Sequence, residues 1–224
     1  MTSTRVLSGH RLESVLATNR VLRHTYTLLG LTLLFSALTA GLAMFSNAPP
    51  LNIWLTMIAY FGLLFLTKSL SHNHWGIVAV FALTGFMGYT LGPILNHYVQ
   101  AFANGHELVM MSLGATGLIF FALSAYALIT QKDFSFMSGF LMVGMLVAFL
   151  GSIATLFFHV PALMLAVSAA FVLISSGVIL LQTSQIIHGG ETNYIMATVT
   201  LYVSLYNLFL SLLNLLSAFG GNKD

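Results

Sequence analysis

The chain has 224 residues, of which 58% are hydrophobic and only 5% are charged. A water-soluble domain carries roughly a quarter of its residues as charged side chains, so this composition excludes an ordinary soluble protein and indicates an integral membrane protein in contact with the lipid bilayer. The formal net charge of +2 is too small to indicate a nucleic-acid partner, and the lack of cysteine excludes disulfides and thiolate metal sites.

Long apolar runs divide the chain into seven segments. A membrane-spanning helix needs about 20 mostly apolar residues, because each residue adds about 1.5 Å across a hydrocarbon core about 30 Å thick. A β-barrel would instead show alternating segments of about ten residues. The sequence therefore predicts an all-α bundle of seven transmembrane helices over residues 25–218, at 25–46, 51–70, 75–98, 107–130, 136–158, 161–185 and 194–218.

Basic residues indicate how the bundle is oriented. Four arginines lie between residues 5 and 23, and Lys68 and Lys132 follow on the same predicted side. Positive residues are retained on the cytoplasmic side of a membrane. We therefore expect a cytoplasmic N-terminal tail at residues 1–24 and a short periplasmic C-terminal tail at 219–224. The N-terminal tail either lies on the membrane surface through its loosely helical apolar spacing or is a polar tail without structure.

Three glycines are spaced along the third predicted helix. Gly85, Gly88 and Gly92 lie three and four residues apart, so they form a groove on one helix face, and Pro93 follows directly. Such a groove favours close packing of another helix. Pro93 removes a backbone donor and is expected to kink or end the helix, and a kinked helix could gate a pore. We favour the packing role.

Side chains able to carry chemistry do not form a catalytic or metal-binding pattern. Ser175 and Ser176 are the candidate nucleophiles, but His188 lies about three helical turns further along, roughly 18 Å away. His72 and His74 would need further metal ligands, and none lies nearby in the sequence. The sequence predicts neither an enzyme nor a cofactor site.

Polar residues gather in the last two predicted helices. Residues 182–185 are all polar, and four residues of the seventh helix recur at three and four positions, namely Ser204, Asn207, Ser211 and Asn214. Polar residues within membrane helices usually face the protein interior. This stripe predicts that the seventh helix lies at the centre of the bundle.

A polar turn joins these two helices. It contains His188, Gly189, Gly190, Glu191 and Asn193. The glycines allow the chain to leave the sixth helix in a conformation that other residues resist, while residues 191–193 offer caps and a negative charge for the start of the seventh helix. We expect the turn to position the seventh helix.

Several stretches resemble the transmembrane Bax inhibitor motif family: "GPILNHY", "SAYALITQKDFSFMSGFLMVG" and "SSGVILLQTSQIIHGGETNYIMATVTLYVSLYNLF". The resemblance covers almost the whole chain and is closest to a bacterial inner-membrane branch. It implies seven helices with the last one central, and a protein that binds the membrane-anchored protease FtsH, restrains its attack on membrane proteins and is itself a slow substrate. The alternative that the family implies is a pH-dependent calcium or cation leak.

The chain departs from the family at two positions. By resemblance, the sixth and seventh helices carry an acidic pair that switches with pH in members that leak calcium, and the matching residues here are Gln182 and Ser204. Two buried carboxyls share a proton because both cannot ionise together, whereas glutamine and serine do not titrate in this range. The sequence thus disfavours the leak mechanism and predicts that Gln182 and Ser204 join the two helices by a hydrogen bond.

Overall fold

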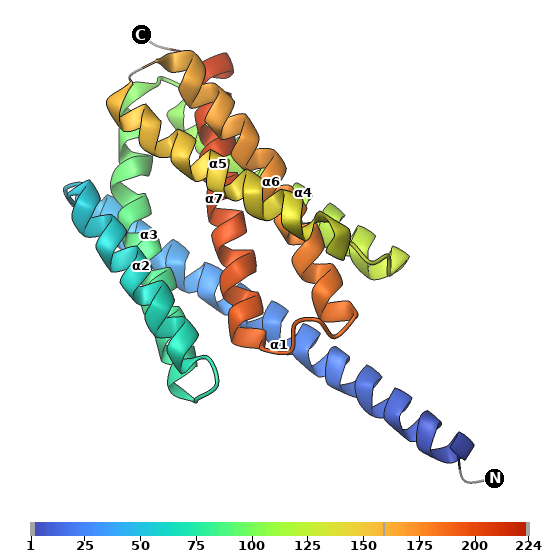
Figure 1. Cartoon of the computed structure of the whole chain (residues 1–224). Helices are drawn as coiled ribbons and strands as arrows, with labels where there is room; N and C mark the ends of the chain where they lie inside the picture. Colours follow the sequence, from blue (N-terminus) through green and yellow to red (C-terminus); the bar gives the residue numbers. More distant parts are fainter. Residues whose placement is uncertain (1–2, 159, 223–224) are drawn as a thin grey trace.

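The computed structural model describes residues 3–158 and 160–222, and it contains helices but no strand within those ranges. Seven α-helices follow one another along the chain (Figure 1): α1 (Ser3–Phe45), α2 (Ile53–Leu70), α3 (Trp75–Ala101), α4 (Gly105–Thr130), α5 (Ser138–Phe157), α6 (Pro161–Ile187) and α7 (Tyr194–Gly220). A short 3-10 turn, η1 (Ser135–Met137), precedes α5. All seven helices are long and apolar enough to cross a membrane, so the predicted all-α transmembrane architecture is confirmed.

Helix α1 is longer than the first predicted span. It begins at Ser3 and runs without interruption to Phe45, while its apolar, membrane-compatible part is Arg20–Phe45. No proline interrupts residues 3–45, so helix propagation from the span into the preceding segment meets no strong breaker. Figure 1 shows the N-terminal part of α1 extending away from the other helices. The tail predicted at residues 1–24 is therefore helical from Ser3 onward.

The glycine groove of α3 packs against α1. A Cβ atom added at Gly88 would overlap the Ser36 carbonyl oxygen and the Thr39 hydroxyl, and one added at Gly92 would lie 2.9 Å from the Ala40 carbonyl oxygen. The two backbones can approach this closely only because the glycines lack side chains. Helix α3 continues past Pro93 to Ala101, so the proline does not end the helix.

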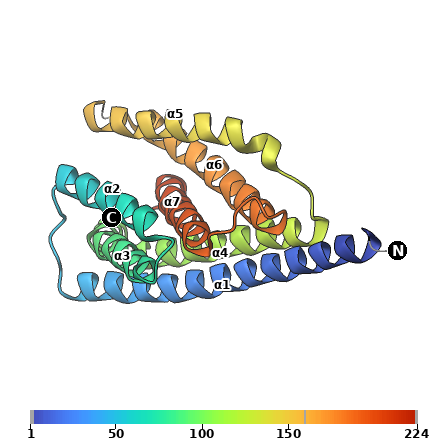
Figure 2. The ribbon, with the colours of Figure 1, turned by 60° about the horizontal axis from the view of Figure 1, so that its bottom comes forward.

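Helix α7 packs against four other helices, α1, α3, α4 and α6 (Figure 2). Its span has the largest buried share of the seven, and its Leu201, Tyr202 and Leu208 belong to the main hydrophobic core. By contrast, α2 packs mainly on α3, and α5 mainly on α6. This packing favours a central α7, which stays a prediction.

Hydrogen bonds group the loops at two ends of the bundle. At one end, the Asn193 side chain donates to the Ser71 carbonyl and Ser184 donates to the Lys132 carbonyl, which ties the α2–α3, α4–α5 and α6–α7 connections together. At the other end, the Asn104 amide donates to the Gly220 carbonyl beside the C-terminus. The grouping agrees with helices that cross the membrane in alternating directions.

Candidate functional site at the ends of α6 and α7

The chain leaves α6 through a glycine with a left-handed backbone. Gly189 has φ +74°, a region that L-amino acids with a side chain rarely adopt. The backbone N–H groups of Gly190 and Glu191 then donate to the Gln185 carbonyl at 2.8 and 3.1 Å, which satisfies an otherwise orphaned acceptor at the helix end. We expected a backbone conformation that requires glycine at both Gly189 and Gly190, and the structure has it at Gly189. At Gly190 an added Cβ would meet no atom closer than 3.6 Å.

Asn193 caps α7 and links it to a second loop. Its side-chain oxygen accepts hydrogen bonds from the backbone N–H groups of Ile195 at 3.0 Å and Met196 at 3.2 Å. Its side-chain nitrogen donates to the Ser71 carbonyl at 3.1 Å. One amide therefore starts the last helix and fixes its position against the α2–α3 connection.

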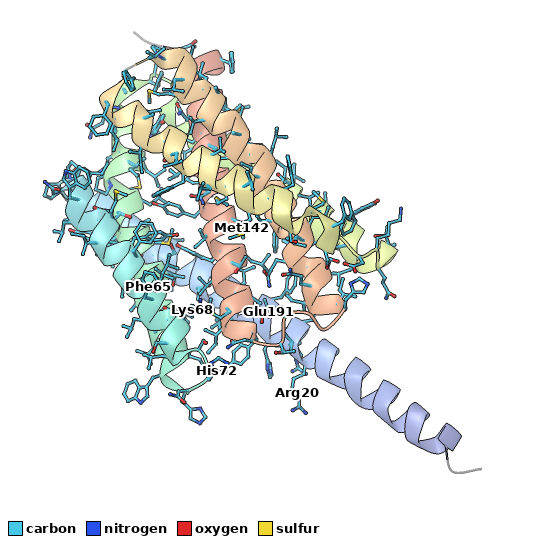
Figure 3. All side chains as sticks on the ribbon, in the orientation of Figure 1. Arg20, Phe65, Lys68, His72, Met142 and Glu191 are labelled. Atoms are coloured by element: carbon cyan, nitrogen blue, oxygen red, sulfur yellow. The ribbon has the colours of Figure 1, made fainter. Side chains whose placement is uncertain are left out.

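Glu191 acts within the turn. Its carboxylate accepts a hydrogen bond from the Asn193 backbone N–H at 2.8 Å, which holds the chain in place before the cap. Figure 3 shows Glu191 at the same end of the molecule as Arg20 and His72. The carboxylate thus stabilises a loop near the start of α7 and lies away from the middle of the bundle.

A second contact, which the sequence analysis did not single out, joins α6 to the α4–α5 connection. The buried Ser184 hydroxyl donates to the Lys132 carbonyl at 3.0 Å and accepts from the Phe134 backbone N–H at 3.1 Å. The two ring nitrogens of His188 lie 2.8 Å from the Ser184 carbonyl oxygen and 3.1 Å from the Gln131 carbonyl oxygen. The sequence signal was the run of four polar residues at 182–185, but it did not reveal which of them met a loop 50 residues away.

Asp133 lies in this same α4–α5 connection. Hydrogen bonds from the Ser135 hydroxyl and from its backbone N–H hold the pKa of the Asp133 carboxyl below its ordinary value. Within the described part of the chain, no group of three histidine or acidic side chains is arranged to bind a metal ion.

The hydrogen bond expected between Gln182 and Ser204 is wrong. Both side chains are buried, but the Ser204 hydroxyl donates to the Thr200 carbonyl of its own helix at 2.8 Å. The Gln182 side-chain nitrogen has no hydrogen-bond partner in the part of the chain that the structure describes. A serine one turn after a carbonyl bonds locally more readily than it reaches across to a neighbouring helix.

The other members of the α7 polar stripe have different surroundings. The Asn214 side chain donates to the Ser168 hydroxyl at 2.9 Å and so joins α7 to α6. Asn207 and Ser211 instead line a cavity of about 870 Å³, which α2 and α5 flank. The 3.6-residue period placed these side chains on one face but could not assign their partners.

Comparisons with known proteins agree with this architecture. The family model described as "Inhibitor of apoptosis-promoting Bax1" matches residues 18–221. The chain is 53% identical to the Escherichia coli K12 protein named "Modulator of FtsH protease YccA", over 94% of this chain and 95% of the relative. It is 51% identical to an uncharacterised protein of Pseudomonas aeruginosa, over 95% and 97% of the two chains, and 40% identical to an uncharacterised membrane protein of Vibrio cholerae, over 94% and 95%. The resemblance in the α6–α7 region is thereby confirmed, and the chain belongs to the Bax inhibitor family of membrane proteins.

Proposed function

We propose that this protein modulates an FtsH-type protease in the bacterial inner membrane, binding it and restraining its proteolysis of other membrane proteins, while being degraded slowly itself. The observation that carries the proposal is the 53% identity, over nearly the full length of both chains, to a relative named as a modulator of FtsH protease. The same relative in a second Escherichia coli strain is named an inner membrane protein.

The end of the bundle that holds the α6–α7 turn offers a surface suited to such a partner. The end of the N-terminal segment that joins the bundle lies there. The Thr198 hydroxyl oxygen, which donates to the Tyr194 carbonyl at 2.7 Å, lies 3.3 Å from the Thr25 carbonyl oxygen, and the ring of His24 meets that of Tyr194 edge-on. The α2–α3 and α4–α5 connections are tied to the same end. We propose that this end is cytoplasmic, in agreement with the arginines before residue 24 and with Lys68 and Lys132.

The segment at residues 1–24 is the proposed handle by which the protease pulls on this chain. Most of it precedes the membrane-compatible part of α1, which begins at Arg20. Since a terminus outside the packed bundle is more easily captured than a loop held at both ends, its removal should slow degradation of this protein and leave its binding to the protease intact.

The experiment uses vesicles that contain FtsH and an unassembled membrane substrate, with and without the full-length protein. We expect slower breakdown of the substrate and co-purification of this protein with the protease. A chain that lacks residues 1–19 should persist longer but still co-purify. A chain that lacks residues 223–224, and so keeps the hydrogen bonds of Asn222 to the α3–α4 connection, serves as the control. Unchanged substrate breakdown without co-purification would refute the modulator proposal, and unchanged turnover of the shortened chain would refute the handle.

The alternative function, a pH-dependent cation leak, lacks the groups that it needs in the described cavity. A cation pathway requires acidic side chains or rings of carbonyl oxygens, and none of the cavity-lining residues carries a carboxylate. Gln182 and Ser204 occupy the positions of the family's acidic pair. We expect no pH-dependent calcium flux in reconstituted vesicles, and the double variant Gln182→Asp/Ser204→Asp tests whether a carboxyl pair alone creates one.

A further inference from the structure

A cavity lies between α2 and α5, and residues of α3, α6 and α7 complete its wall. The two helices that flank it each rest mainly on one neighbour, α2 on α3 and α5 on α6. They approach one another through the rings of Phe61 and Phe149, whose centroids lie 6.1 Å apart. Figure 1 shows α7 behind the space between them. With a volume of about 870 Å³, the cavity falls within the size range of sites for small organic ligands.

Besides the hydroxyls of Ser138 and Ser211, two larger hydrogen-bonding side chains in this cavity are unpaired among the described residues. In residues 3–158 and 160–222, neither the Tyr60 hydroxyl nor the Asn207 amide has a hydrogen-bond partner, and both residues line the cavity. An amide or hydroxyl without a partner in an apolar medium is unfavourable. The cavity therefore offers donors and an acceptor to whatever occupies it.

These groups lie deep in the membrane. Asn207 is thirteen residues from either end of α7 (Tyr194–Gly220), which corresponds to about 20 Å of helix in each direction. Tyr60 lies in the middle third of α2 (Ile53–Leu70). A ligand that reaches both groups must place its own polar atom near the centre of the bilayer.

The lining also determines the charge of the ligand. None of the residues around the cavity is Asp, Glu, Lys, Arg or His, and most of the wall is Met, Phe, Leu, Ile or Val. A phospholipid that extended its polar end to Asn207 would bring its phosphate close to the membrane centre without a cation beside it, which is strongly unfavourable. A free acyl chain would fill the walls but leave Tyr60 and Asn207 unpaired.

We propose that the cavity binds an uncharged lipid whose oxygen-bearing head accepts hydrogen bonds from Tyr60 and Asn207 and whose apolar tail passes between α2 and α5. The required chemistry is a neutral carbonyl or hydroxyl on a long hydrocarbon body, and both an isoprenoid quinone and a diacylglycerol have it. This site is separate from the loop surface proposed for the protease and does not depend on that function.

Photo-crosslinking of the full-length protein in phospholipid nanodiscs tests the site. Three probes are compared at equal mole fraction: an azido-ubiquinone analogue, a diacylglycerol with a diazirine in one acyl chain, and a phosphatidylcholine with the same diazirine chain. We expect one of the two neutral probes to label cavity-lining residues of α2, α5 or α7, with saturation and with competition by its unlabelled form. The probe that does so identifies the source. The phosphatidylcholine should label lipid-facing residues without saturation.

Three variants connect the labelling to the cavity. Asn207→Leu keeps the side-chain volume and removes the amide, so the half-saturating probe concentration should rise about five-fold, as expected for one lost hydrogen bond. Met145→Trp fills the cavity from α5 and should reduce saturable labelling at least about ten-fold. Leu113→Trp adds the same ring to an exposed position of α4 outside the cavity and should change nothing.

Gel filtration and circular dichroism establish that each variant is folded before it is labelled. If neither neutral probe labels the cavity saturably, or if the folded Met145→Trp protein is labelled as strongly as the wild type, the proposal is overturned. Labelling that Met145→Trp abolishes but Asn207→Leu leaves unchanged would overturn the assigned hydrogen bond to the amide.

Discussion

Asn193 allows the two roles of the α6–α7 turn to be separated. Its side-chain oxygen caps α7 through the N–H groups of Ile195 and Met196, and its side-chain nitrogen bonds the Ser71 carbonyl. Asn193→Ala removes both contacts, whereas Asn193→Asp keeps an acceptor for the cap and removes the donor to Ser71. Asn193→Asp therefore reports the link between the loops, and the difference between the two variants reports the cap.

The expected magnitudes follow from the bonds that each variant loses. Loss of an N-cap costs about 1 kcal/mol, and loss of a neutral hydrogen bond costs about 0.5–1.5 kcal/mol. Asn193→Ala should therefore lower the free energy of unfolding by about 1.5–2.5 kcal/mol. In Asn193→Asp the lost bond is partly offset, because a negative charge at a helix N-terminus contributes about 0.3–1 kcal/mol, so the expected loss is about 0–1 kcal/mol.

Equilibrium unfolding in mixed micelles of detergent and SDS, followed by circular dichroism, measures both values. Thr192→Ala, at the exposed position just before the cap, is the control and should change the unfolding free energy little. If Asn193→Ala destabilises the protein no more than Thr192→Ala does, neither the cap nor the link to Ser71 contributes and the reasoning is refuted.

Three further substitutions probe other contacts. Gly88→Leu should lower the free energy of unfolding by about 1–3 kcal/mol, because the new side chain meets the α1 backbone. Gly114→Leu, at an open position of α4, is the control and should be nearly neutral in the same unfolding assay. Ser184→Ala leaves the Phe134 N–H and the Lys132 carbonyl without their partner, so the free energy of unfolding should fall by about 1–3 kcal/mol. Hydrogen exchange in the α4–α5 connection should become faster, and unchanged exchange would contradict this role of Ser184. Ser135→Ala removes the hydroxyl that lowers the pKa of Asp133, so that pKa should rise toward its ordinary value in an NMR titration. A pKa that is lower in the folded protein than in the unfolded chain stabilises the folded protein at a pH above the unfolded-state pKa. This stabilisation is lost as the pH falls through the folded-state pKa. The Ser135→Ala variant should therefore lose less stability from Asp133 on acidification than the wild type.

The membrane helices could be predicted well because their signal is local. A run of about 20 apolar residues satisfies the bilayer wherever its neighbours lie, so the ends of α2 and α3 agree with the sequence to within a few residues. The start of α1 could not be predicted in this way. Hydropathy marks where a chain meets lipid but does not mark where the helix itself begins, and the helix continues to Ser3.

The partners of polar side chains were harder to predict because they depend on which helices become neighbours. Ser204 and Asn214 lie on one face of α7, yet the first bonds its own helix and the second bonds Ser168 of α6. Ser184 has the same chemistry as Ser204, but it ends opposite the α4–α5 connection and bonds that loop. Ser184 and Ser204 share a residue type, and Ser204 and Asn214 share a helix face, so the packing of the neighbouring segment decides the outcome.

The same contrast explains why the end of the bundle and its middle suggest different kinds of partner. At the α6–α7 turn, Asn193, Glu191 and Ser184 all form hydrogen bonds to backbone groups, so the turn is held in place before any partner binds. In the cavity, Tyr60 and Asn207 lack such bonds and face an uncharged, apolar wall. A protein partner that approaches from the aqueous phase fits the first environment. The second requires a molecule that is already dissolved in the membrane and that carries its own hydrogen-bonding atom to the centre of the bilayer.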